Sequence, residues 1–467
     1  MKKNYSKQQN VCIIGAGFSG LAAGVLLSKK GYRVTIFERE KILGGRALSL
    51  IPSSLGLSDY LDLLSRFKIS VPFSVPDLET IFEKKMIDDY KLDSGFHLIG
   101  GGRKYVADGD FADIGSNLGF LGSRTGFVTD EGYRYHFFSK LDKIKLLPRV
   151  FQLFFYYRES RLKKLDLVPI AISLKQFKND KLKHALELFS RGISTFNDLS
   201  MISTGETIRS LPKLLRGTHS LGYPIGGLKN ISNAYADFII GNQGTIIYGT
   251  AVEEIVVENN RAQGVVVDGL FKNFDIVISS MPVQNLFSIV DESCFSSKYV
   301  NQLKNLISSG GLCAYYSLKK ISNPDLLGKT FMFLQENLDV QGGAAFGLID
   351  FKTACPVTGL APKDNYLVQA YVICTPDEAK NITVVKKLRN VLDSWMRKLI
   401  VDFDEQLNWA IYPAAQQLEG VAKIITNEKP TVETPIDNLY LIGDCIKAPD
   451  FGVNCAVSSA RILADIL

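Results

Sequence analysis

Apolar runs alternate with glycine-rich turns at the start of the chain, a pattern typical of a βαβ unit. Residues 11–14 form a short continuous apolar run, which predicts a parallel strand buried on both faces. A helical segment over residues 21–30 follows and ends at Gly31, in the position of a helix C-cap. Residues 33–37 form a second apolar run. Strand, helix and strand in this order predict the beginning of an open parallel sheet.

The turn between the first predicted strand and the helix has the spacing G-x-G-x-x-G. Gly15 permits a tight turn, Gly17 lets a pyrophosphate approach the backbone, and Gly20 lets the helix pack closely on the strand. The following helix would offer unpaired N–H groups to phosphate oxygens. Glu38, followed by Arg39, ends the second strand, where a carboxylate can accept hydrogen bonds from ribose hydroxyls and would repel a 2′-phosphate. The segment therefore predicts a dinucleotide site that disfavours NADP.

Two further segments extend this site beyond a simple dinucleotide loop. Gly44 and Gly45 would let the chain pass close to a bound cofactor, and Arg46 could bring a guanidinium to a phosphate or a flavin. Near the C-terminus, residues 438–442 predict a buried strand that ends at Gly443 and Asp444.

A helix predicted over residues 455–467 follows this last strand. Its N-terminus, near Val453, would stabilise negative charge on a reduced flavin. Asp444 could hold a ribityl hydroxyl or a bridging water.

Taken together, these motifs resemble the FAD-dependent amine oxidase and phytoene desaturase superfamily, whose fold protoporphyrinogen oxidase and the Rab GDP-dissociation inhibitors share. Residues 223–228 are similar to the central segment of that family. The resemblance implies FAD as cofactor, and it implies that the backbone of Val252 contacts the adenine. The expected cofactor-binding residues are Gly15, Gly17, Gly20, Glu38, Arg39, Gly45, Arg46, Val252, Gly443, Asp444 and Val453.

We therefore expect an α/β protein with a discontinuous Rossmann-type FAD-binding domain and an inserted α+β substrate domain. The FAD-binding domain is expected over residues 1–91, 222–285 and 431–467; the substrate domain is expected over residues 92–221, mainly helical, and 286–430, a sheet plus a helix. That helix is predicted to start at the capping box of residues 375–378 and to bury an apolar face that reaches Leu399.

The resemblance says less about the substrate. Amine oxidases of this superfamily end in a Trp- and Tyr-rich segment that cages the amine, whereas residues 443–445 and 451–454 here carry no such segment. This departure favours the phytoene desaturase-like branch, with hydride transfer between an apolar isoprenoid or lipid-like substrate and flavin N5. The alternatives are an amine oxidase, a protoporphyrinogen oxidase-like enzyme, or a binding protein like the Rab GDP-dissociation inhibitors.

No sequence motif identifies a catalytic residue. His97 is a candidate for acid–base chemistry, with a hydrogen-bonded core histidine as the alternative, and Tyr412 is a candidate for the cavity wall, with core packing as the alternative. A second G-x-G-x-x-G is absent from the sequence, so reoxidation would fall to oxygen, a quinone or a partner protein.

The charge of the chain and its distribution limit the kinds of partner that we expect the protein to bind. The formal net charge is +6, and residues 140–164, with eight basic and two acidic side chains, account for all of it. We expect no nucleic-acid partner from so mild a surplus. Apolar positions among these basic residues predict a peripheral contact with an anionic membrane surface, and an internal helix with a solvated basic edge is the alternative.

The number and spacing of the cysteines and histidines indicate the cellular compartment in which we expect the protein. Seven scattered cysteines and four histidines predict neither disulfides nor a metal site. We expect a cytoplasmic protein without a cleaved signal, because the glycines near the N-terminus are explained by the phosphate loop.

Overall fold

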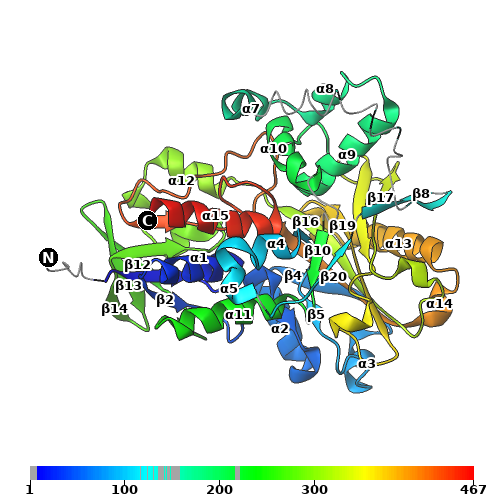
Figure 1. Cartoon of the computed structure of the whole chain (residues 1–467), viewed down its shortest axis with the longest axis horizontal. Helices are drawn as coiled ribbons and strands as arrows, with labels where there is room; N and C mark the ends of the chain where they lie inside the picture. The colour runs from blue at the N-terminus through cyan, green and yellow to red at the C-terminus, as the bar shows by residue number, and fades with distance from the viewer. Residues whose placement is uncertain are drawn as a thin grey trace.

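The computed structural model describes residues 8–467 except 116, 124, 130, 135–140, 142–143, 145–147, 149–157 and 216–220. Figure 1 shows two lobes. One lobe contains both described chain ends and the helices α1, α11 and α15, and the other contains a large sheet with α13 behind it. A group of small helices, α7 to α10, lies above the junction of the lobes.

A five-stranded parallel sheet forms the centre of the first lobe. Its strands, in the spatial order β11-β2-β1-β15-β21, are Thr245–Ile247, Arg33–Phe37, Asn10–Ile14, Ile276–Ser279 and Leu439–Leu441. Val11 of β1 lies between Val34 of β2 and Ile276 of β15. The sheet takes strands from both ends and the middle of the chain, so the Rossmann-type domain is discontinuous, as predicted.

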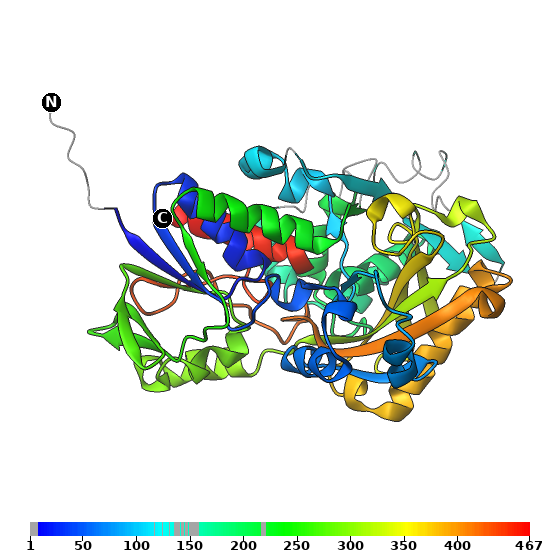
Figure 2. The same ribbon diagram turned by 90° about the horizontal axis from the view of Figure 1, so that it is seen from below.

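Three helices cover one face of this sheet. They are α1 (Phe18–Lys29), α11 (Leu228–Gly241) and α15 (Gly452–Ile466), which lie side by side in Figure 2. An antiparallel sheet of β12 (Glu254–Glu258), β13 (Arg261–Val267) and β14 (Leu270–Asn273) lies against the opposite face. Asn259 and Asn260 make the β12–β13 turn with φ of 50° and 59°, values that Asn tolerates better than most residues.

An eight-stranded, mostly antiparallel sheet forms the second lobe. Its strands, in the order β4-β20-β16-β19-β18-β17-β8-β9, are Ile69–Val75, Leu407–Glu419, Ser309–Leu318, Tyr366–Cys374, Ala344–Asp350, Thr330–Glu336, Thr125–Thr129 and Gly132–Arg134. The helices α13 (Ile382–Leu399) and α14 (Phe403–Gln406) belong to this lobe, and the apolar side of α13 is buried, as predicted.

The predicted start of this helix is wrong. Thr375 and Glu378 do form a reciprocal capping box, with N···O distances of 2.8 and 3.2 Å, but it closes a single 3₁₀ turn. The helix begins after Asn381, whose side chain accepts hydrogen bonds from the amides of Thr383 and Val384.

Four helices lie over the edge where the lobes meet, and we call them the helical block. They are α7 (Glu159–Leu165), α8 (Ile170–Leu174), α9 (Asp180–Ser194) and α10 (Thr204–Leu215). The smaller helices elsewhere are α2 (Leu57–Arg66), α3 (Leu78–Glu83), α4 (Arg103–Val106), α5 (Ala112–Gly115) and α12 (Ser297–Lys304). The short strands β3 (Ser49–Leu50), β5 (Leu92–Asp93), β6 (Ile99–Gly100), β7 (Phe120–Ser123) and β10 (Leu221–Pro224) complete the described elements.

Three segments differ from the predicted domain boundaries. Strand β4 lies within residues 1–91 but pairs with β20 in the large sheet. Helix α12 lies within residues 286–430, yet its Val300 and Leu303 pack in the core of the first lobe. The stretch from Ile99 to Leu118 also packs in that core. The reason is physical, because an element joins the lobe where its apolar face finds a partner, and composition along the chain does not reveal that partner.

Most of the basic segment 140–164 lies outside the described residues. In the part of the chain that is described, no helix combines the length and apolar character needed to cross a bilayer. The described residues also contain no grouping of His, Cys, Asp or Glu side chains suited to a metal ion.

Candidate functional site

The glycine loop connects the carboxyl end of β1 to α1. Gly15 has φ of +98°, a backbone conformation that L side chains rarely adopt. A Cβ added at Gly20 would lie 2.0 Å from the carbonyl oxygen of Gly15, so the helix can approach the loop this closely only without a side chain there. Both glycines are therefore required by the local backbone.

A second glycine turn lies directly against the first. The amide of Gly44 donates to the carbonyl of Ala16 over 3.0 Å, and a Cβ on Gly45 would lie 3.2 Å from the Cα of Gly17. Gly44 and Gly45 have φ of +114° and +59°. The two turns thus present adjacent backbone with no side chain between them.

Glu38 lies at the end of β2 beside the glycine loop. One carboxylate oxygen accepts the amide of Ala16 at 2.6 Å, and the other accepts the amide of Glu40 at 2.9 Å. Burial raises the pKa of Glu38, although these hydrogen bonds oppose the shift. Arg39 extends outward with a side chain that is 53% exposed.

Arg46 and Asp444 join the second glycine turn to the end of β21. The Arg46 guanidinium lies 2.5 Å from the Asp444 carboxylate, which also accepts the amide of Gly420 at 2.8 Å. Burial alone would raise the pKa of Asp444, but the Arg46 charge and the hydrogen bonds outweigh it and hold that pKa below its ordinary value. The pair is therefore ionised.

These groups surround one cavity of about 480 Å³. Of the predicted cofactor residues, its lining includes Gly15, Gly17, Glu38, Arg39, Gly45, Arg46, Val252, Gly443, Asp444 and Val453. Gly20 lies behind the loop instead. The lining also contains Arg66, Phe67, Lys68, Ser280 and Gln417, which the sequence analysis missed. Of these five residues, only Ser280 could have been found from the sequence, because it directly follows the apolar run of β15.

A second, smaller cavity of about 90 Å³ adjoins the first. It lies between α9 and the strands β17 to β20, and most of its lining is apolar or aromatic. The lining residues that belong to this cavity alone include Phe96, Phe189, Ile193, Met332, Phe346, Leu348, Tyr371 and Phe451. The residues that line both cavities are His97, Leu418, Gly452 and Val453.

His97 therefore lies at the junction of the cavities. Its Nε2 is 2.6 Å from the carbonyl oxygen of Ser94, to which the neutral ring donates. Burial lowers the pKa of His97 to about 4, so the imidazole is neutral near pH 7.

The structure places Tyr412 away from both cavities. Its side chain is 1% exposed in the core of the large sheet, and its hydroxyl donates to Asp393 of α13 over 2.7 Å. Residues alternate between the two faces of a strand, and Tyr412 shares the α13 face with Ala410 and Ala414. The prediction that it lines a cavity wall is wrong.

Glu419, at the end of β20, lines the small cavity and was missed by the sequence analysis. The available signal was a charged residue at the end of an otherwise uncharged strand, which is a weak indication because strand ends are commonly polar.

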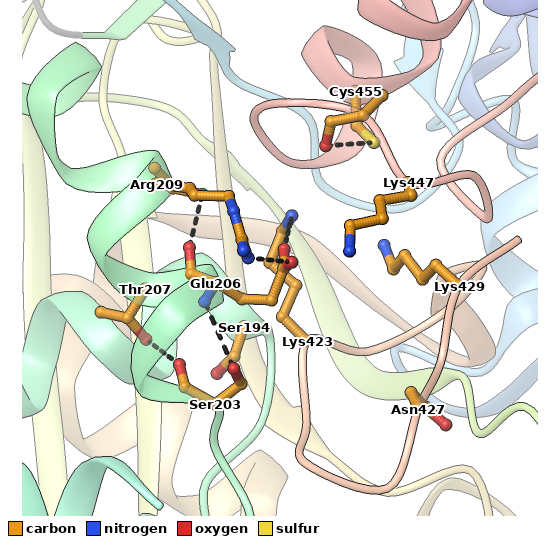
Figure 3. Close-up of polar contacts among 12 residues, drawn as sticks. Ser194, Ser203, Glu206, Thr207, Arg209, Lys423, Asn427, Lys429, Lys447 and Cys455 are labelled. Atoms are coloured by element: carbon orange, nitrogen blue, oxygen red, sulfur yellow. Dashed lines mark hydrogen bonds and ion pairs between the residues drawn. The ribbon is translucent and has the colours of Figure 1, made fainter. Parts of the chain in front are cut away.

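A network of partly buried charges fastens the helical block beside this site. Glu206 of α10 pairs with Lys423 at 3.2 Å and with Arg209 at 2.7 Å, and Arg209 also pairs with Asp166 at 2.6 Å. Figure 3 shows Lys423, Lys429 and Lys447 extending toward Glu206 and Arg209 from the chain between β20 and α15. The Lys423 side chain is 1% exposed. The network therefore links α10 to the segment that follows β20.

Known proteins are similar to this chain in sequence and in fold. A 1-hydroxycarotenoid 3,4-desaturase from Flavobacterium is 25% identical over 97% of this chain and 98% of its own. A neurosporene-forming phytoene desaturase from Rhodobacter capsulatus is 30% identical over 60% of this chain and 54% of its own. The fold matches an oxidoreductase from Methanosarcina mazei with a TM-score of 0.71 and 19% identity, over 98% of this chain and 100% of that one.

A family-level comparison covers nearly the whole chain. Residues 18–467 match the family described as flavin containing amine oxidoreductase. The chain belongs to the family of flavin containing amine oxidoreductases, and its cofactor is FAD.

Proposed function

We propose that the large cavity holds FAD through the residues that line it. The space beside Gly17 and Gly45 is bounded by bare backbone, which suits a pyrophosphate. Glu38 is placed for the ribose, and the Arg46–Asp444 pair for the polar groups near the flavin. Val252 lines the cavity, and no hydrogen bond among the described residues uses its amide, which is therefore available to the adenine.

We propose further that the protein is a desaturase-type oxidoreductase acting on an apolar isoprenoid or lipid-like substrate. FAD, when bound, supplies the acceptor for a hydride. The observation that carries the proposal is the apolar cavity that shares His97, Leu418, Gly452 and Val453 with the FAD cavity. Two relatives named as carotenoid or phytoene desaturases support the substrate class.

The residues of the chain exclude water and orient the substrate. Most of the side chains that line the small cavity are aromatic or aliphatic, so an apolar segment binds there by losing its contact with water. Neutral His97 adds no charge beside the substrate.

The volume of the small cavity, about 90 Å³, is below the roughly 300–1,000 Å³ of typical ligand sites. It holds the reacting segment of a long chain but not a whole isoprenoid. Helix α9 contributes Phe189, Gly192 and Ile193 to the lining, so a long substrate requires α9 to shift outward.

The test is reduction of the bound flavin in the absence of oxygen. Purified holoprotein is mixed with acyclic carotenoid precursors in detergent, and separately with a panel of primary amines and diamines. We expect the oxidised flavin absorbance to bleach with the polyenes only. Bleaching with amines alone would replace the proposal by an amine oxidase activity, and a protein that binds no flavin would exclude both.

We also propose that the helical block contacts the cytoplasmic face of a membrane. Leu167 and Ile172 are 75% and 53% exposed, and the exposed Lys163 and Lys164 lie close by in sequence. Each basic residue near an anionic surface contributes about 1 kcal/mol. Sedimentation with vesicles containing phosphatidylglycerol tests this contact, and Lys163→Glu with Lys164→Glu should release the protein. Equal binding to neutral vesicles would contradict it.

A further inference from the structure

Glu419 occupies an unusual position in the wall of the small cavity. It ends strand β20 and is 2% exposed. Among the described residues that line this cavity, it carries the only carboxylate. A buried carboxylate in apolar surroundings is costly unless it is held by hydrogen bonds.

Both oxygens of this carboxylate are held in place. Oε1 accepts the backbone amide of Gly452, the first residue of α15, at 3.1 Å. Oε2 accepts the Thr195 hydroxyl at 2.8 Å. Each carboxylate oxygen can accept about two hydrogen bonds. One acceptor position on each oxygen therefore stays available to a group in the cavity.

The surroundings make Glu419 a stronger base than an exposed glutamate. Burial raises the pKa of Glu419, and this effect outweighs the ammonium groups of Lys429 and Lys423, which lower it. The titratable and charged groups that influence or feel this carboxylate are Lys423, Lys429, Asp444, Arg46, Tyr371 and Cys455.

We propose that Glu419 is the catalytic base that removes the substrate proton. The inference rests on the proposed desaturase function. Forming a C=C bond from a CH–CH unit removes one hydride, which the flavin accepts, and one proton from the neighbouring carbon. That proton forms the O–H bond of the Glu419 carboxyl, and the electron pair of the broken C–H bond becomes the new π bond.

Two hydroxyls lie next to the Glu419 carboxylate. The Thr195 hydroxyl lies 2.9 Å from the hydroxyl of Ser309, and Ser309 in turn accepts the Glu419 amide at 3.0 Å. Thr195 has φ of +51°, in the left-handed region, which turns the chain at the end of α9. The hydroxyls of Thr195 and Ser309 are thus the first groups to which the proton can move.

His97 and Tyr371 are weaker candidates for the same role. The Nε2 of His97 is engaged with Ser94, and burial lowers the pKa of the ring to about 4. Burial raises the pKa of Tyr371, so its hydroxyl keeps its proton.

The decisive variant is Glu419→Gln, because an amide still accepts from Gly452 and donates to Thr195. We expect flavin reduction by the polyene to slow by about 100-fold or more. FAD content, substrate affinity measured by fluorescence quenching, and the midpoint of thermal unfolding should not change. Asp393→Asn is the matched control, since it converts a buried carboxylate to an amide on the opposite face of the same sheet.

Two further readouts separate a base from a structural cap. The infrared difference spectrum between low and high pH contains the carbonyl stretch of every carboxyl that titrates, and subtracting the Glu419→Gln spectrum from that of the wild type should leave the band of Glu419. The wild-type rate of flavin reduction should rise with pH through the titration of Glu419, whereas the variant should lack this dependence.

The outcomes are distinguishable. A wild type that no polyene reduces overturns the proposed function and the inference with it. A reactive wild type whose Glu419→Gln variant keeps more than about a tenth of the rate overturns the inference alone. If Glu419→Gln fails to bind FAD, Glu419→Asp serves instead. It should retain the infrared signal and lose at least about 10-fold in rate, and an unchanged rate would contradict the assignment.

Discussion

The large cavity is lined by glycine turns, charged side chains and apolar groups around the carboxyl ends of parallel strands, whereas the small cavity is lined mostly by apolar side chains from an antiparallel sheet and α9. The first depends on glycines that keep side chains out. The second depends on apolar side chains that keep water out. Substitutions can therefore impair one cavity without the other, although His97, Leu418, Gly452 and Val453 line both.

The largest effect is expected at the glycine loop. Gly17 caps α1 with φ of −72°, and a Cβ there meets no atom closer than 3.9 Å, so Gly17→Leu is compatible with the fold. Its side chain would enter the large cavity, and we expect FAD binding to weaken by at least about 100-fold, or about 2.8 kcal/mol. Flavin fluorescence titration of the apoprotein measures this change.

Gly56→Leu is the control for this variant. Gly56 caps α2 with φ of −71° and has no neighbour within 4 Å of an added Cβ. Unchanged FAD binding is expected in the control. Normal FAD binding in Gly17→Leu would show that the phosphate site lies elsewhere.

The opposite effect, a loss of activity toward the polyene without a loss of FAD, is expected from a substitution at Gly192 of α9. A Cβ at this position would lie 3.1 Å from the ring of Phe346 in the small cavity. We expect Gly192→Leu to lower kcat/KM for the polyene by about 100-fold and to leave FAD content unchanged. Gly241→Leu, at the end of α11 where nothing lies within 4 Å, is the control. Loss of FAD in Gly192→Leu would mean that the two cavities are not separable.

A smaller effect on stability is expected at the partly buried charge network around Glu206. The charges of Lys423, Lys429 and Arg209 outweigh burial and lower the pKa of Glu206 to about 2. The stabilisation from its ionised form is present above the unfolded pKa of about 4.3 and is lost as the pH falls toward 2. We expect Glu206→Gln to lower the free energy of unfolding by about 3 kcal/mol at pH 7.

Chemical denaturation over a range of pH values measures this loss. The difference from wild type should shrink below pH 4. Glu292→Gln, which breaks the exposed pair with Lys304, should cost less than about 1 kcal/mol. Equal losses in the two variants would contradict a fastening role for the network.

The smallest effect is expected at His97. Because burial keeps its pKa near 4, the imidazole does not titrate between pH 6 and pH 8. We expect His97→Asn to slow flavin reduction by less than about 10-fold and to leave the shape of the profile over this range unchanged. A change in that shape would identify His97 as a titrating catalytic group.

The first half of the site could be predicted from sequence because its determinants are local. Gly15, Gly17 and Glu38 lie on one βαβ unit, where spacing alone fixes which groups converge. Gly443 and Asp444 could be added because the carboxyl ends of parallel strands meet at one edge of the sheet.

The second half could not be predicted, because much of its lining comes from strands whose apolar residues are equally typical of a protein core. Tyr412 and Glu419 lie on the same strand, yet Tyr412 faces α13 and Glu419 faces the cavity. Choosing between them requires the register of β20 against β4 and β16, which is irregular at several points. Sequence periodicity does not supply that register.

The wall common to both cavities has a thermodynamic consequence. Gly452 and Val453 line both compartments, so ligands in the two compartments share these contacts. If bound FAD changes the affinity for the polyene by some factor, the bound polyene must change the affinity for FAD by the same factor, because linkage is reciprocal. FAD should therefore dissociate more slowly during purification when the polyene substrate is present. Protein from which FAD has been removed should bind the polyene more weakly.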